Sequence, residues 1–114
     1  MAGTLQVNES STWTPAGWIF NNVLERIALR LESEDEELAT TVFDSLGPMP
    51  GHLDLSLATA DRVRRFTKAA EEVSGRADQA GVSAFADQHF YDNFQRELRL
   101  LLQYLHSDPR TLKE

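Results

Sequence analysis

Apolar residues recur at three- and four-residue intervals in four stretches of the chain, a spacing typical of amphipathic helices. The first stretch follows Thr14 and Pro15, and such a pair often begins a helix because threonine caps it and proline fits its first position. The last stretch has the longest apolar stripe and is expected to form the centre of the core. We therefore predict helices over residues 15–31, over 34–46, from Thr59 to a stop at Gly81, and over 84–106 after a cap at Ser83.

The second predicted helix has the clearest boundaries. Ser33 and Glu36 are three residues apart, as in a capping box, in which each side chain accepts a hydrogen bond from the other residue's amide. Gly47 suits the left-handed position that follows a helix, and Pro48 cannot continue one. These signals predict a helix over residues 34–46.

A different pattern follows this helix. Leu53, Leu55 and Leu57 alternate with polar residues, which is the two-residue period of a β-strand. No partner strand is evident in the sequence, so we expect an extended connector around residues 52–57 that packs on helices. The alternative is that two copies of the chain pair through this segment in a dimer.

Together these elements predict an all-α fold, a compact bundle of four to five helices around the helix over residues 84–106. A chain of 114 residues, of which 41% are hydrophobic and 25% charged, is typical of one globular domain. We place the helical domain at residues 14–108, after a loose N-terminal tail (1–13) and before a short C-terminal tail (109–114).

Composition excludes several kinds of chemistry. The absence of cysteine rules out disulfides, zinc–thiolate sites and cysteine nucleophiles. No apolar run approaches the roughly 20 residues of a membrane-spanning helix, and residues 1–8 lack the basic and apolar parts of a secretory signal. We therefore expect a cytoplasmic protein that does not bind membranes.

The negative charge is confined to the first half of the chain. Residues 1–57 hold nine acids and two bases, whereas residues 58–114 hold nine of each, so the whole net charge of −7 belongs to the first half. Nucleic acids and anionic membranes are bound through clusters of Lys and Arg. This balance argues against both as partners.

Five carboxylates fall within residues 32–37, interrupted only by Ser33. The helix dipole favours those in the first turn of the second helix and explains about half of the cluster. The excess, and the lack of Lys or Arg between residues 31 and 61, indicates a surface for a basic protein partner, because complementary charge speeds and selects association. Trp18 is expected in the core. The residues predicted to bind the partner are Glu32, Glu34, Asp35, Glu37, Asp44 and Trp13, the last as an exposed aromatic hot spot.

A basic run, consisting of Arg62, Arg64, Arg65 and Lys68, lies on the third predicted helix. Nucleic-acid binding would call for interleaved aromatic residues, which this run lacks. We expect a solvated face. The alternative is that the run meets the acidic cluster, within one chain or between two copies.

No motif indicates catalysis or a cofactor. The serines lack the nucleophile elbow, and the glycines form no phosphate-binding loop. His89 shares a helical face with Asp92, but two ligands do not hold a metal ion. We therefore predict no catalytic residue, no metal and no cofactor. A ligand-binding bundle with a pocket near His89, Tyr91 and Asn93 is an alternative.

The segment His52-Leu53-Asp54-Leu55-Ser56, followed by a helix that carries Phe66 and Ala69-Ala70, resembles a stretch in some small bacterial immunity-type proteins. Those proteins neutralise a partner toxin, and many are small, acidic and free of catalytic motifs. The resemblance implies a binding function and supplies no residue-level site.

The sequence thus predicts a non-enzymatic protein-binding module that presents an acidic surface to a basic partner, with toxin neutralisation as one concrete form. The alternatives are a structural homodimer and a small ligand-binding helical protein.

Overall fold

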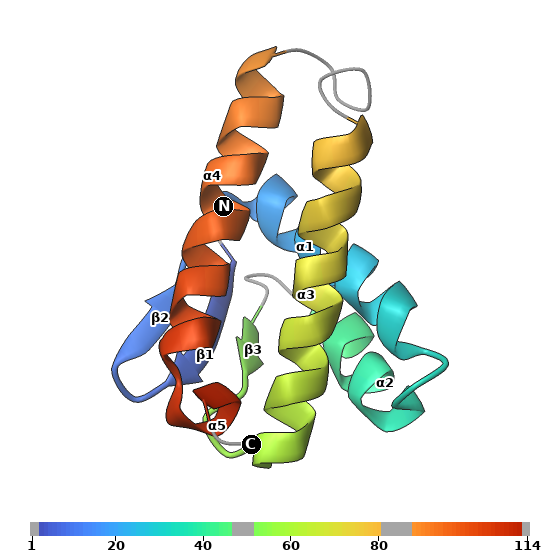
Figure 1. Ribbon diagram of the computed structural model, residues 1–114, viewed down its shortest axis with the longest axis vertical. Helices are drawn as coiled ribbons and strands as arrows, with labels where there is room; N and C mark the ends of the chain where they lie inside the picture. Colours follow the sequence, from blue (N-terminus) through green and yellow to red (C-terminus); the bar gives the residue numbers. More distant parts are fainter. Residues whose placement is uncertain (1–2, 47–51, 81–87, 113–114) are drawn as a thin grey trace.

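A computed structural model describes residues 3–46, 52–80 and 88–112 of the chain, and Figure 1 shows the elements within them. A short sheet accompanies the helices, so the prediction of an all-α fold is wrong. In chain order the elements are β1 (Thr4–Asn8), β2 (Ser11–Trp13), α1 (Gly17–Leu31), α2 (Glu36–Asp44), β3 (His52–Asp54), α3 (Ala60–Ala80), α4 (Gln88–Ser107) and α5 (Pro109–Leu112).

The sheet has the strand order β2-β1-β3. β1 runs antiparallel to β2 and parallel to β3, and Leu5 in β1 lies opposite both Trp13 and Leu53. The segment expected to be an extended connector therefore pairs as a strand within the same chain. Its partner lies in the stretch that we expected to be a loose tail, where Leu5 and Val7 alternate with polar residues too briefly to stand out.

The turn between β1 and β2 is closed by a local hydrogen bond. The backbone amide of Ser10 donates to Oδ1 of Asn8 at 2.8 Å. Asparagine side chains stabilise such turns because they bond to the backbone two residues on. The hairpin therefore forms from local chemistry, and it brings Leu5 and Trp13 to the same side of the sheet.

Three of the four predicted helices start or end close to the expected residues. α1 begins at Gly17, two residues after Pro15, and the N-cap residue Ala16 makes no side-chain capping bond. α3 begins after Thr59, whose hydroxyl accepts from the amide of Arg62 at 3.3 Å. α4 ends at Ser107, one residue after the predicted end at 106. The predicted signals at Gly47, Pro48, Gly81 and Ser83 lie outside the described residues.

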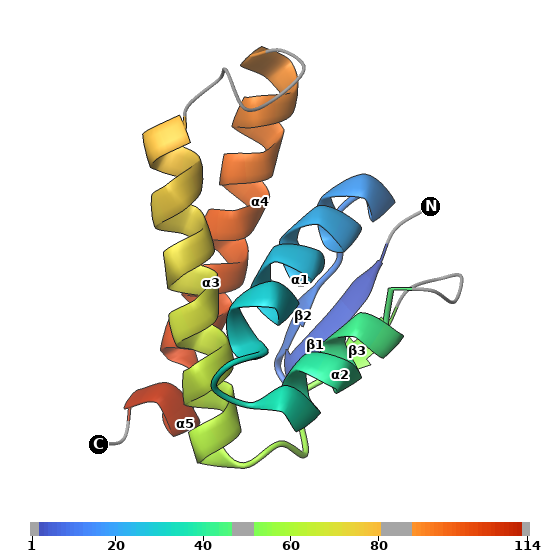
Figure 2. The same ribbon diagram turned by 90° about the vertical axis from the view of Figure 1, so that its right-hand side faces the viewer.

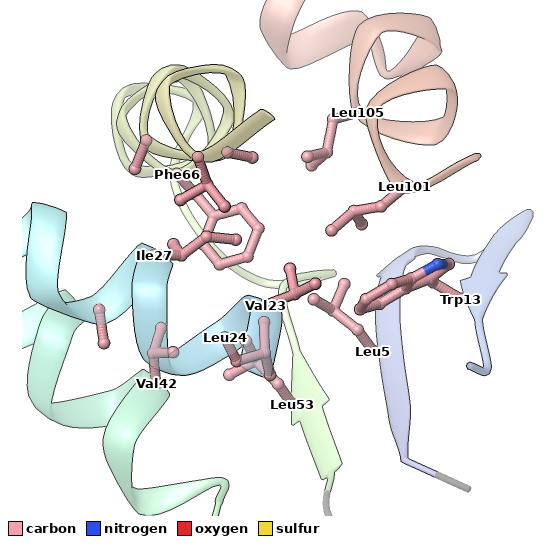
Figure 3. Packing of buried hydrophobic residues seen from close by; sticks show 14 of the residues in the cluster. Leu5, Trp13, Val23, Leu24, Ile27, Val42, Leu53, Phe66, Leu101 and Leu105 are labelled. Atoms are coloured by element: carbon pink, nitrogen blue, oxygen red, sulfur yellow. The ribbon is translucent and has the colours of Figure 1, made fainter. Parts of the chain in front are cut away.

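The core lies between the sheet and the helices. Figure 3 shows side chains from every layer converging there, with Leu5, Trp13 and Leu53 from the sheet facing residues of α1 and α4. α3 and α4 stand side by side and extend beyond the sheet at one end, as Figures 1 and 2 show. The prediction that α4 contributes a long apolar stripe to the core is confirmed for Phe94, Leu98, Leu101 and Leu105, which are buried, but not for Phe90, which is exposed.

The segment expected to be a C-terminal tail begins with the short helix α5, and Arg110 of α5 joins distant parts of the fold. Its guanidinium donates to the backbone oxygens of Val7 (2.7 Å), Leu55 (2.7 Å) and Ala58 (2.9 Å). It also pairs with Asp108 at 2.9 Å, and Asn8 donates to the other oxygen of that carboxylate at 2.7 Å. The hydrogen bond from Arg110 is the main reason that the pKa of Asp108 lies far below its usual value. One side chain thus holds β1, α5 and the segment after β3 together.

Candidate functional site

The acidic run begins with a turn, and the helix that follows starts later than predicted. The amides of Glu34 and Asp35 donate to the backbone oxygen of Leu31 at 3.0 and 2.7 Å, so these residues belong to the turn that ends α1. Asp35 is the N-cap of α2, and its Oδ1 accepts from the amide of Leu38 at 3.1 Å. The predicted capping box at Ser33 is therefore wrong, because the turn after α1 already includes that residue.

Asp35 is buried and ion-paired. Its Oδ2 accepts a 3.0 Å hydrogen bond from Nη1 of Arg65 and lies 3.5 Å from Nε of Arg62, and its side chain is only 6% exposed. The amide of Leu38, followed by the hydrogen bond from Arg65 and the charges of both arginines, lowers the pKa of this carboxyl despite its burial. Asp35 therefore joins α2 to α3 and is not available to a partner, contrary to our prediction for this residue.

Further ion pairs surround this buried contact. Arg62 lies 2.8 Å from Glu37 and Lys68 lies 3.8 Å from Glu34. The basic run thus meets the acidic run within one chain, which was one of the two alternatives to a solvated face. The guanidinium of Arg64 donates to the backbone oxygen of Arg110 at 3.2 Å, which links α3 to α5.

The outward side of α2 carries three exposed carboxylates, of which only Glu37 belongs to this network. We call Glu36, Glu37 and Asp44 the acidic face, since their positions in α2 place them on one exposed side of the helix. Glu36 and Asp44, together with Glu32 in the preceding turn, make no ion pair within the described residues. The acidic face therefore keeps a net negative charge after the internal pairs are counted.

The two tryptophans exchange the positions that we predicted for them. Trp13 is fully buried, its indole N–H donates to the backbone oxygen of Glu97 at 2.9 Å, and its ring stacks near Phe20. Its place at the end of β2 turns it into the core, so Trp13 is not the exposed aromatic residue that we expected. Trp18 is 37% exposed and meets Phe90 edge to face.

A groove between α1 and α3 was not predicted. It encloses about 310 Å³ and is lined by Arg26, Leu29, Arg30, Val73 and Arg76. The three arginines make no ion pair with an acid in the part of the chain that the structure describes. The four-residue spacing of Arg26 and Arg30 was the available signal, but only the fold brings Arg76 to the same place.

His89 and His106 each contact one polar side chain. The ring of His89 lies 3.1 Å from the amide nitrogen of Asn93 at the exposed start of α4, and His106 lies 2.8 Å from Glu71. No group of three His, Cys, Asp or Glu side chains able to hold a metal ion occurs among the described residues. Within those same residues no helix has the length and apolar character needed to cross a membrane.

Comparisons with protein-family models, with curated proteins and with solved structures find no match to this chain. No relative therefore bears on the resemblance to immunity-type proteins. Two charged features of the structure are candidate sites: the acidic face of α2 and the arginine groove between α1 and α3.

Proposed function

We propose that this protein is a non-enzymatic protein-binding module whose acidic face on α2 docks against a basic protein partner. The observation that carries the proposal is the set of exposed carboxylates, Glu36, Asp44 and the nearby Glu32, that no described base neutralises. Neutralisation of a toxin in the cytoplasm, which the resemblance to immunity-type proteins implies, is one concrete form of this function.

The acidic face is held rigidly, which favours binding. Leu38, Ala39 and Val42 bury the inner side of α2, while Asp35 fixes its first turn to α3. A surface that is ordered before association loses less conformational entropy when a partner docks. The buried side of α2 and the ion pair of Asp35 therefore hold the helix in position, while its outward carboxylates remain exposed.

Long-range charge adds to the local contact. The chain has a net charge of −7, so its field attracts a basic protein and raises the association rate more than the final affinity. Screening by salt weakens such attraction beyond about 10 Å at 0.1 M ionic strength. Binding through the acidic face is therefore expected to weaken markedly with added salt, mainly through a slower association rate.

The test compares two charge reversals of equal size. Glu36→Lys/Asp44→Lys changes the acidic face, and Glu9→Lys/Glu25→Lys makes the same change in net charge at exposed residues elsewhere. Affinity capture from the native cell, followed by measurement of Kd with the purified partner, should give a basic protein retained by the wild type and by the control but not by Glu36→Lys/Asp44→Lys. Equal Kd values for both variants, or a partner without basic character, would contradict the proposal.

A homodimer is the second candidate. β3 lies at the edge of the sheet, and Leu57, three residues after it, is 94% exposed. An open strand edge is a template for pairing with another chain. Sedimentation over a wide concentration range decides the matter, since a dimer formed here should dissociate in the variant Leu57→Asp and a wild type that stays monomeric removes this candidate.

A further inference from the structure

We propose that the groove between α1 and α3 is a binding site for a small organic polyanion, a molecule that carries phosphate or carboxylate groups on a short apolar frame. The inference does not depend on the proposed function of the acidic face. It rests on the charges, the shape and the volume of the groove.

The charge of the groove is unusual for this chain. Arg26 and Arg30 are one turn apart on α1, and like charges at that spacing destabilise a helix. Arg76 brings a third positive charge from α3. Even Glu72, one turn before Arg76, forms no ion pair with it. The groove therefore gathers positive charge and lacks a counter-charge from the described residues.

Several bases elsewhere in the fold have acidic partners. Arg62 and Arg65 pair with Asp35, Lys68 pairs with Glu34, and Arg110 pairs with Asp108. The chain holds 18 acids and 11 bases, so acidic residues are abundant overall. Acidic residues are thus missing from the lining of this groove although the chain has many of them. An anionic ligand supplies the missing negative charge.

The guanidinium groups suit phosphate and carboxylate. Arginine presents a planar fork of N–H donors that matches two oxygens of either group, and such bidentate contacts are stronger than neutral hydrogen bonds. The guanidinium of Arg26 lies 5.7 Å from the centre of the buried Phe94 ring. This cation–π contact holds Arg26 in place before a ligand arrives, so less side-chain entropy is lost on binding.

The remaining lining is apolar. Leu29 is 56% exposed, whereas Val73 is 3% exposed. Exposed leucine beside three cations favours a ligand with carbon as well as charge, because burial of apolar surface adds to the electrostatic term. Inorganic phosphate alone would leave the Leu29 side chain uncovered.

The volume of the groove fits a small molecule. The groove encloses about 310 Å³, and small-molecule sites begin at about 300 Å³.

Thermal unfolding in the presence of defined anions tests the site. The probes are phenyl phosphate, pyrophosphate and citrate at equal ionic strength, with sodium chloride as the salt control. A ligand that binds only the folded state at about 100 times its Kd is expected to raise Tm by roughly 10 °C. Phenyl phosphate and citrate distinguish a phosphate site from a carboxylate site, and stabilisation by either supports the proposal.

Matched variants locate the binding. Arg26→Gln/Arg30→Gln should abolish the rise in Tm, while Arg96→Gln/Arg99→Gln, which removes two charges from α4, should retain it. Because Arg26 also contacts Phe94, Arg30→Gln/Arg76→Gln is the second test variant. Three results would overturn the proposal. They are a rise that persists in both groove variants, no stabilisation by phenyl phosphate or citrate at 10 mM (roughly 100 times a Kd of 0.1 mM) even if pyrophosphate stabilises, and self-association of the wild type that the groove variants abolish.

Discussion

Arg65 donates a 3.0 Å hydrogen bond to the buried carboxylate of Asp35, thirty residues earlier in the chain. This contact makes one residue both the cap of α2 and the link from α2 to α3. Much of the acidic run is thereby explained by the fold, and the carboxylates left for a partner are those on the outward side of α2.

The replacement of Asp35 should separate its two roles. Asp35→Asn keeps an oxygen for the Leu38 amide but loses the charge, and a loss of about 1 kcal/mol is expected in the free energy of unfolding. Asp35→Ala also leaves the Leu38 amide without its acceptor, so a loss of about 2 kcal/mol is expected in the free energy of unfolding. Urea unfolding measures both. Glu36→Gln, at an exposed position one residue on, is the control and should change stability by less than about 0.5 kcal/mol.

Stability should fall in acid because two aspartates are charged in the folded state. The pKa values of Asp35 and Asp108 are lowered on folding, through the Leu38 amide and through Arg110 respectively. The unfolded chain, with aspartate pKa values near 3.9, then binds more protons. The stability that the lowered pKa values of these two aspartates contribute is complete above about pH 5. It is lost as pH falls through the folded pKa values. Urea midpoints between pH 2 and pH 7 should show this decline, and Asp108→Asn should reduce its size.

The loss of Arg110 should be among the most damaging single changes. Asp108 is 1% exposed, so Arg110→Ala leaves a buried carboxylate without its partner, at a cost of about 3–5 kcal/mol. Arg110→Lys keeps the charge but loses the fork that spans Val7, Leu55 and Ala58, so only part of the stability should return. In a double-mutant cycle with Asp108→Asn, the two losses should not add. Additive losses would show that the pair is not coupled.

The sheet is tested by two leucines of different burial. Leu5 in β1 is fully buried, and Leu5→Ala should cost about 2–5 kcal/mol. Leu57 is 94% exposed, and Leu57→Ala should change stability by less than about 0.5 kcal/mol. Equal effects in urea unfolding would contradict the paired sheet, since a loose N-terminal tail gives Leu5 no core to occupy.

The helices were predictable from the sequence because their apolar stripes are long. Fifteen residues of α1 and twenty of α4 repeat the helical period several times. β2 and β3 have three residues each, too few to establish a period of two, and the polar residues around Leu5 concealed β1. Strand pairing between residues 4–6 and 52–54 depends on the tertiary fold, so no local sequence pattern predicted it.

The candidate site was predictable in part. The sequence located the carboxylates and their preference for a helix start, but the turn that follows α1 includes Ser33 and leaves Asp35 as the cap of α2. Trp13 was misplaced because its burial follows from β2, an element too short to predict. The groove could not be predicted from the sequence, because it forms only where α1 packs against α3 and places Arg76 and Arg30 in one lining.

The position of Arg110 has a consequence for synthesis of the chain. β1 is synthesised before residues 52–54, with which it pairs, and before Arg110, whose side chain donates a hydrogen bond to the backbone oxygen of Val7. Contacts between such distant residues slow folding, because a long loop must close before they form. The contacts of β1 are therefore completed only after residue 110 has left the ribosome, and until then the chain exposes more of Leu5 and Val7 than the folded protein does.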